Sequence, residues 1–188
     1  MALGLLACVG LAAAGEDKVE LSWKGDIRLR HEQTFKDNDE ASLGEEIFNE
    51  DSETVRRRDR VRLRVGAKAK LPAGFEANLR LATGGSNAVS TNQSYKDAFN
   101  GKTFQLDQAF LKWSQDGATL LGGKMKNPFQ KPHKKGETIW DGDVNPEGYA
   151  ASYTVAGVSA TVANFNLSEV SKGADVTMQG AQLVYEHD

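Results

Sequence analysis

Arginine occupies alternate positions within parts of two stretches of the chain, and these side chains are the best suited to attract charged molecules. Their members are Arg28 and Arg30 in residues 19–32, and Arg58, Arg60, Arg62 and Arg64 in residues 58–71. Side by side on one face, they would form a ladder of guanidinium groups. Other charged side chains predicted on the same face are Lys24, Asp26, Lys68, Lys70 and Arg80. Such a wall would attract anions.

Acidic side chains in the same segments could cancel this charge. Like charges this close need counter-ions, and the candidates are Asp26, Glu32, Glu76 and Asp107. Two interpretations therefore stay open. The basic residues either line a lumen and select anions, or they form internal salt bridges with a purely structural role.

The elements that must position these residues are strands with two unlike faces. In residues 19–32 the apolar Leu21, Trp23 and Ile27 alternate one for one with charged side chains. Successive side chains of a strand point to opposite faces of the sheet. Both stretches exceed the roughly 9–11 residues that a tilted strand needs to cross a membrane, whereas strands of soluble sheets are typically about 5–6 residues long. This pattern is typical of a wall between lipid and a watery lumen.

The connections between predicted strands alternate between short and long. Besides 19–32 and 58–71, the predicted strands are 75–83, 104–114, 118–125, 148–155, 158–166 and 176–186. Short turns at 72–74, 115–117 and 156–157 alternate with long connections at 33–57, 84–103 and 126–147. Antiparallel neighbours with tight turns at one end and long loops at the other produce this order. The sequence thus predicts an all-β fold, an antiparallel transmembrane β-barrel with about eight strands in this chain.

Aromatic residues near the short-turn ends predict a girdle at the lipid interface. They are Trp23, Phe75, Trp113, Tyr153 and Tyr185. Tryptophan and tyrosine favour the headgroup level of a membrane. Phe104 and Phe165 are predicted to mark the opposite rim. The alternative is that all of these are ordinary core aromatics.

Several segments together resemble the Putative porin family of Gram-negative outer membranes. They are 23–30 (WKGDIRLR), 58–64 (RDRVRLR), 106–113 (LDQAFLKW), 122–129 (GGKMKNPF) and 139–148 (IWDGDVNPEG). The resemblance implies a barrel in the bacterial outer membrane, in contact with lipid and lipopolysaccharide, that carries small hydrophilic solutes by diffusion. It also suggests a homotrimer. Because such barrels are commonly much longer than this chain, residues 15–188 are expected to be the N-terminal portion of a larger barrel.

The same resemblance implies a role for the third long connection, 126–147. In general porins this loop folds inward and narrows the pore, and its acidic side chains would here face the arginine ladder. The candidate constriction residues are Lys131, His133, Lys134, Asp141, Asp143 and Glu147. The alternative is an exposed surface loop.

Oxygen-bearing side chains suggest two sites for divalent cations, neither of them strong. Asp141, Asp143, Asn145 and Glu147 alternate as in a calcium loop, but Pro146 and Ser152 stand where an EF-hand has glycine and glutamate. The first long loop carries Asp37, Asp39, Glu40, Glu45, Glu46, Glu50, Asp51 and Glu53. Such a run could bind cations near lipopolysaccharide, although it is more often only solvated. No metal site and no cofactor are predicted.

Residues 1–14 differ from the rest of the chain. They are apolar and end in three alanines, which is typical of a secretory signal peptide; a buried N-terminal helix is the alternative. Cys8, the single cysteine, lies within this segment, so the mature chain would contain none. A net charge of -3 does not suggest a nucleic-acid binder.

Two other function classes remain open. A secreted soluble β-sandwich could bind carbohydrate, but it would use aromatics in loops, and the tryptophans here lie mostly in strands. A barrel enzyme would need a nucleophile motif, and none surrounds His31, His133 or His187. We therefore expect no enzyme activity. A barrel should need detergent for extraction, whereas a lectin should stay in the aqueous phase.

Overall fold

A single antiparallel sheet makes up the fold in this computed structural model. The structure describes residues 18–36, 54–85, 87–96, 101–131 and 141–186. The strands are β1 (Glu20–Lys36), β2 (Thr54–Lys70), β3 (Phe75–Thr83), β4 (Gln93–Ser94), β5 (Phe104–Gln115), β6 (Ala118–Lys124), β7 (Glu147–Val155), β8 (Val158–Ser168) and β9 (Val176–Tyr185). A short 3-10 helix, η1 (Pro72–Gly74), joins β2 to β3. All eight predicted strands are present, with ends that differ by a few residues for the longest two.

The sheet follows the chain, with each strand beside the next one in sequence. Its order is β1-β2-β3-β5-β6-β7-β8-β9, and β4 pairs with the upper part of β2. β1 and β2 pair over their whole length, so that Ile27 lies opposite Leu63 and Arg28 opposite Arg62. This register places apolar side chains of both strands on one face and charged side chains on the other. The expected guanidinium ladder on adjacent strands is therefore present.

Three tight turns at one end of the sheet share one backbone conformation. Each contains a pair of residues with positive φ: Ala73 and Gly74, Asp116 and Gly117, Ala156 and Gly157. Paired left-handed residues match the twist of antiparallel strands, and glycine adopts this conformation without steric cost. At Gly117 a Cβ atom would lie 2.4 Å from the carbonyl oxygen of Thr154. The three short connections predicted from the sequence are therefore present as tight turns.

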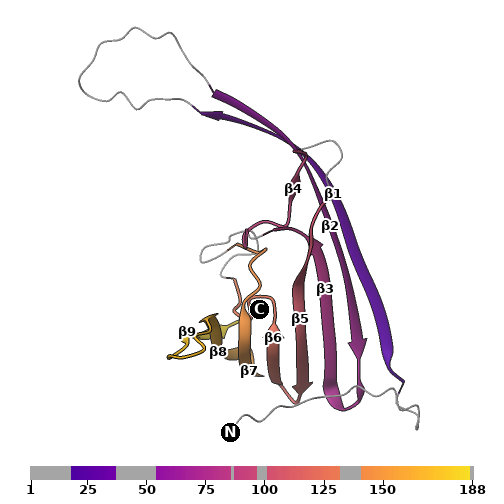
Figure 1. The fold of residues 1–188 in the computed structure, drawn as a ribbon. Helices are drawn as coiled ribbons and strands as arrows, with labels where there is room; N and C mark the ends of the chain where they lie inside the picture. Colours follow the sequence, from indigo (N-terminus) through magenta and orange to yellow (C-terminus); the bar gives the residue numbers. More distant parts are fainter. Residues whose placement is uncertain (1–17, 37–53, 86, 97–100, 132–140, 187–188) are drawn as a thin grey trace, which may run out of the picture.

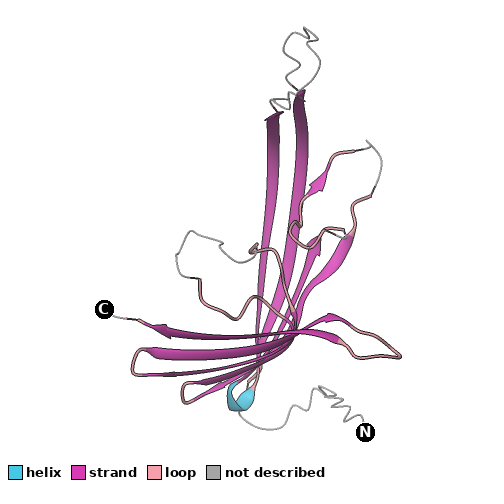
Figure 2. Ribbon diagram, turned by 90° about the vertical axis from the view of Figure 1, so that its left-hand side faces the viewer, coloured by secondary structure: helices cyan, strands magenta, loops and turns pink. Residues whose placement is uncertain are grey.

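The sheet curves strongly and is not closed. β1 to β3 rise along one side of the molecule, whereas β7 to β9 wrap across toward the other (Figures 1 and 2). β1 and β9 are the two edges, and no pairing joins them in the described part of the chain. The architecture is all-β and antiparallel. Among the described residues no helix is long and apolar enough to cross a membrane.

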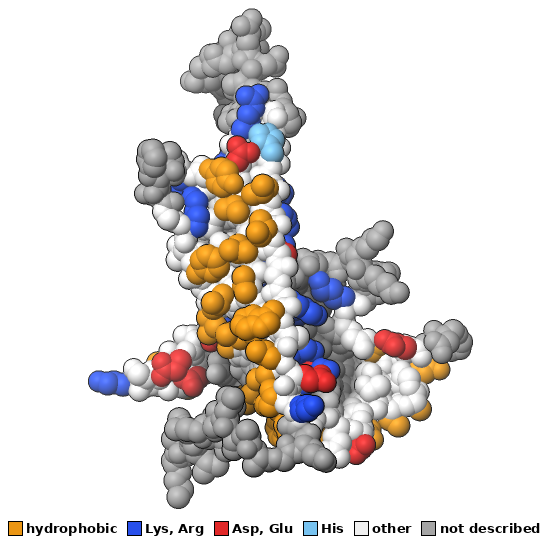
Figure 3. Space-filling model, turned by 90° about the vertical axis from the view of Figure 1, so that its right-hand side faces the viewer, with side chains coloured by type: hydrophobic (Ala, Val, Ile, Leu, Met, Phe, Trp, Pro, Cys, Tyr) orange, Lys and Arg blue, Asp and Glu red, His pale blue; other side chains and the backbone are white. Residues whose placement is uncertain are grey.

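The outer, convex face is apolar. An apolar stripe runs along the exposed side of β1 and β2 (Figure 3). Trp23, Ile27 and Leu29 are 69%, 73% and 72% exposed there. Large apolar side chains exposed in a continuous stripe mark a surface that another apolar medium or molecule covers.

The inner, concave face carries a small apolar core at its β6 to β9 end. Met125, Ala150, Ala163 and Phe165 are buried together. Phe129, from the loop after β6, packs edge-on against Phe165 with ring centroids 6.2 Å apart. The prediction that Phe165 marks an outer rim is therefore wrong. Small apolar residues occupy both faces of β8, so alternation alone does not reveal which face is the inner one.

Candidate pore-lining site

Asp26 organises the middle of the arginine ladder. Its Oδ2 accepts hydrogen bonds from Nε and Nη2 of Arg62, at 3.1 Å and 2.7 Å. Its Oδ1 accepts one from Nε of Arg64 at 2.6 Å. The alternation of β1 and β2 brings these three side chains to the same face. One carboxylate thus offsets part of the charge of two arginines.

Glu32 likewise forms ion pairs with several arginines at the upper end of the ladder. Its Oε2 lies 3.0 Å from Nη2 of Arg58 and 3.4 Å from Nη1 of Arg60. Its Oε1 lies 3.3 Å from Nη2 of Arg30. Three guanidinium groups share one carboxylate, so the cluster keeps a positive surplus.

Arg28 differs from the other arginines of the ladder. Its Nη2 donates a 2.7 Å hydrogen bond to the amide Oδ1 of Asn92. No ion pair joins Arg28 to a carboxylate within the residues described. Its Nε is buried and has no hydrogen-bond partner there, like those of Arg58 and Arg60.

Asn92 belongs to an inward excursion of the β3–β5 connection that the sequence did not reveal. Nη2 of Arg60 donates to Oγ of Ser90 at 3.2 Å and to the carbonyl of Asn92 at 3.3 Å. Oγ1 of Thr83 donates to the carbonyl of the buried Thr91 at 3.0 Å. The segment therefore covers the upper concave face. Its residues lack a periodic pattern that would predict this position. The run of polar, uncharged side chains from 90 to 94 is the one feature of the sequence that could have indicated it.

The loop between β6 and β7 is fixed to the concave face close to both of its ends. Near β7, Nδ2 of the buried Asn145 donates to Oδ1 of the buried Asp107 at 2.8 Å. Nε2 of Gln108 donates to Oδ1 of Asn145 at 2.7 Å. Asp107 also forms an ion pair with Arg80 on the neighbouring strand. Next to β6, Phe129 covers the small apolar core.

Only one of the predicted constriction residues that the structure describes makes a contact with the arginine ladder. Oδ1 of Asp143 lies 3.5 Å from Nη1 of Arg64, so this acid does face the ladder. Glu147 instead pairs with Lys124 at 2.9 Å, and Lys131 and Asp141 are exposed. His133 and Lys134 lie outside the described residues, as do the acidic residues of 37–53 and the apolar segment 1–14.

The residues with calcium-loop spacing do not come together as a metal-binding site. Hydrogen bonds direct Asp143 toward Arg64, Asn145 toward Asp107 and Glu147 toward Lys124. Oδ1 of Asp141 accepts the backbone N–H of Asp143 at 2.8 Å. Among the described residues no three His, Cys, Asp or Glu side chains could hold a metal ion together.

The predicted interface aromatics lie on the convex face. Trp23, Phe75, Tyr153 and Tyr185 are exposed there. Trp113 lies opposite Phe75 in the sheet and donates from Nε1 to the carbonyl of Ala73 at 3.1 Å. An exposed ring beside a turn suits a membrane interface, where the ring meets lipid and the polar groups meet water.

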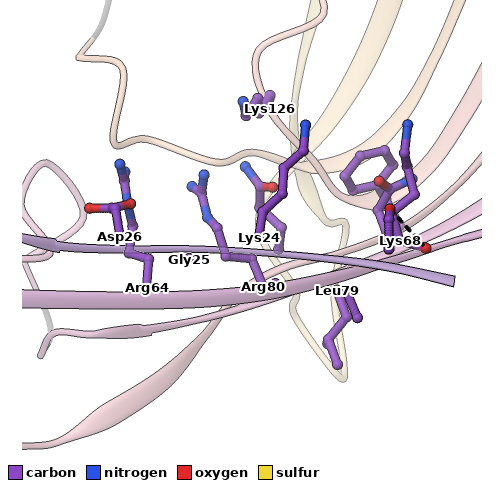
Figure 4. A pocket seen from close by; sticks show the side chains of 14 residues that line it. Lys24, Gly25, Asp26, Arg64, Lys68, Leu79, Arg80 and Lys126 are labelled. Carbon is purple, nitrogen blue, oxygen red and sulfur yellow. Dashed lines mark hydrogen bonds and ion pairs between the residues drawn. The ribbon is translucent and has the colours of Figure 1, made fainter.

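Below the ladder, the concave face is hollowed into a cavity of about 370 Å³. Five basic side chains line it, Lys24, Arg64, Lys68, Arg80 and Lys126, together with the acidic Asp26. Lys24 rises from β1 toward the side on which Lys126 lies (Figure 4). Lys126 is an exposed residue, but partial desolvation lowers the pKa of its ammonium group, and repulsion from Arg80, Arg64 and Lys24 lowers it further. Basic side chains therefore outnumber acidic ones in the lining of this cavity.

A curved antiparallel sheet with an apolar convex face and an ionic concave face partly covered by loops is the architecture of a porin-like protein. The model of the family described as "Putative porin" matches residues 46–170, and the chain belongs to this family. This confirms the family expected from the sequence motifs. No curated protein matches the chain.

Proposed function

We propose that the protein is a passive diffusion channel of the bacterial outer membrane, with the concave face of the sheet as part of the lumen wall. The observation that carries this proposal is the separation of the two faces of β1 and β2. Ile27 exposes an apolar side chain on the convex face, whereas Arg62 on the concave face forms an ion pair with Asp26. Lipid suits the first face, and water and ions suit the second.

The open edges of the sheet support a barrel. Unpaired backbone groups of β1 and β9 would be exposed to hydrocarbon, which costs several kcal/mol for each unsatisfied group. Pairing with further strands, as expected for a larger barrel, satisfies them. An eight-stranded barrel leaves an interior just wide enough for side chains, and the two inward connections would fill it. We therefore favour the wider channel.

The inward connections narrow this channel. The excursion around Asn92 and the loop around Asn145 both lie over the concave face and make hydrogen bonds to it. Asp143 of the loop faces Arg64 of the wall. This ion pair holds the loop against the wall and so narrows the opening.

A preference for anions follows from the charges that remain after pairing. Asp26 and Glu32 each share their charge among several arginines, and Arg28 and Lys24 have no carboxylate partner within the described part of the chain. Lys24 is an exposed residue, so anions in the lumen can pair with its ammonium group.

The remaining features fit this assignment. Outer-membrane lipid and lipopolysaccharide would contact the convex face and its aromatic residues, residues 1–14 would direct export, and a homotrimer is the expected assembly. The proposal assigns the chain no catalytic step, cofactor or nucleic-acid partner. Small hydrophilic solutes, with a bias toward anions, are the expected cargo.

Planar-bilayer recording of the full-length protein tests the proposal. The protein should require detergent for extraction and should produce ohmic conductance steps. Under a potassium chloride gradient the reversal potential should have the sign of chloride preference. A protein that stays in the aqueous phase, or one that forms no conducting unit, would contradict the proposal. Denatured protein at the same detergent concentration is the control.

A further inference from the structure

The cavity near Lys24 lies on the concave face, where a glycine interrupts a row of side chains that runs across neighbouring strands. Lys24 pairs with Gly66, Gly66 with Arg80, and Arg80 with Gln108, so these residues form one row across β1, β2, β3 and β5. Gly66 therefore leaves a space between Lys24 and Arg80. A Cβ atom at Gly66 would lie 3.0 Å from the carbonyl oxygen of Leu79. The floor of the cavity is thus backbone, with cationic side chains on both sides.

The basic side chains around this floor fall into two groups. Three have carboxylate partners: Arg64 pairs with Asp26 and Asp143, Lys68 with Glu76, and Arg80 with Asp107. Lys24 and Lys126 have none within the described residues. The two unpaired ammonium groups come from different elements, since Lys24 lies on β1 and Lys126 follows β6 in the loop.

The charged groups nearest to Lys126 are mostly cations. Partial desolvation and three neighbouring cations lower the pKa of Lys126, against the attraction of Asp107. An anion placed between the two lysines would reverse this repulsion. The ammonium group of lysine is a compact charge that binds phosphate well without requiring a planar, bidentate partner.

We propose that this cavity is a binding site for a small dianionic oxyanion, held between Lys24 and Lys126 during passage through the lumen. The inference rests on the proposed channel function. Two unpaired ammonium groups match two negative charges. The cavity volume of about 370 Å³ lies in the range of small-ligand pockets, roughly 300–1,000 Å³. Inorganic phosphate, organic phosphate esters and dicarboxylates share the required chemistry.

Binding is measured on the full-length protein in detergent by titration calorimetry with inorganic phosphate. We expect saturable binding at one site per chain. Lys24→Gln and Lys126→Gln should each weaken it by about tenfold or more, because each removes one charge-assisted contact. Lys70→Gln is the matched control, since Lys70 pairs with the exposed Glu20 outside the cavity. Parallel titrations with glycerol phosphate, succinate and chloride identify the preferred dianion.

Three results overturn the inference. They are an absence of saturable binding, equal affinity in the wild type and both cavity variants, and an equal loss in the control. Circular dichroism and the mobility of unboiled protein on electrophoresis verify that each variant is folded. If Lys24→Gln does not fold, Lys126→Gln alone decides, because Lys126 lies outside the strands.

Bilayer recording separates this inference from the proposed channel function. A conducting channel whose chloride current phosphate does not reduce would contradict the site and leave the channel intact. Saturable binding in detergent without any conductance would support the site and contradict the channel. If both proposals hold, phosphate should reduce the chloride current in the wild type and in Lys70→Gln, with a weaker effect in both cavity variants.

Discussion

Asn145 in the loop before β7 donates a 2.8 Å hydrogen bond to the buried carboxylate of Asp107 on β5. The two residues are far apart in sequence, and their contact fixes the loop to the wall. Asn145 also accepts a hydrogen bond from Gln108, and Asp107 pairs with Arg80. A single amide thus connects the loop to a charged network that spans two strands.

Asn145→Ala should loosen this loop. The substitution leaves buried polar atoms of Asp107 and Gln108 without a partner, which costs about 1–3 kcal/mol of unfolding free energy. Proteolysis within residues 126–146 should accelerate, and single-channel conductance should rise if the loop narrows the pore. Asn166→Ala, at an exposed position on β8, should change neither. Equal conductance in Asn145→Ala and the wild type would contradict a narrowing role for this loop.

Local patterns reveal the strands of this protein but not its inward loops. Alternation along β1 and β2 specifies both the strands and the shared face of Asp26, Arg62 and Arg64. β4 was missed because it is two residues long and is defined only by its pairing with β2. The contacts of Arg28 with Asn92 and of Asp107 with Asn145 join distant parts of the chain that have no periodic signal.

Asp26→Asn should make the lumen more positive. The carboxylate partner shared by Arg62 and Arg64 disappears, while the shape of the side chain stays nearly the same. The reversal potential under a salt gradient should move toward that of a perfectly anion-selective channel. Loss of the charge-assisted hydrogen bonds should cost about 1–3 kcal/mol of unfolding free energy. A shift toward cations would contradict a lumenal position for Asp26. Glu20→Gln, which removes one exposed carboxylate outside the cavity, is the control.

Asn92→Asp should reduce the anion preference. The new carboxylate would stand where Oδ1 of Asn92 now lies, 2.7 Å from Nη2 of Arg28, and would neutralise that arginine in place. The reversal potential should move in the opposite direction from that of Asp26→Asn. Asn87→Asp adds the same charge at an exposed position and should have a smaller effect. Equal shifts in both variants would mean that overall charge, rather than Arg28, determines selectivity.

Neighbouring positions on β2 should differ in their contact with lipid. A polarity-sensitive probe at Leu63 should report hydrocarbon and one at Arg62 should report water in reconstituted vesicles, because successive side chains face opposite sides. Replacing Cys8 with serine leaves the engineered cysteine as the single label site within residues 1–188. Ile27→Lys should destabilise the inserted protein, by about 2–4 kcal/mol if the side chain lies near the bilayer midplane. Equal wetting at positions 62 and 63 would contradict a membrane-spanning sheet.

The charge on Lys126 should make the stability of the loop depend on alkaline pH. Partial desolvation and the nearby Arg80, Arg64 and Lys24 lower the pKa of Lys126 below the usual lysine value in the folded protein. Between the folded and unfolded pKa values the unfolded chain therefore holds one more proton, so the unfolding free energy should rise with pH through this window. Below the window, the charged Lys126 destabilises the fold, and Lys126→Gln should be at least as stable as the wild type. Above the window, the difference in stability between Lys126→Gln and the wild type should disappear.

Nuclear magnetic resonance titration of isotope-labelled lysine measures the pKa of Lys126 directly. Lys24→Gln should raise this pKa because one of the repelling charges is gone. An unchanged pKa in Lys24→Gln would mean that the two ammonium groups do not share the cavity.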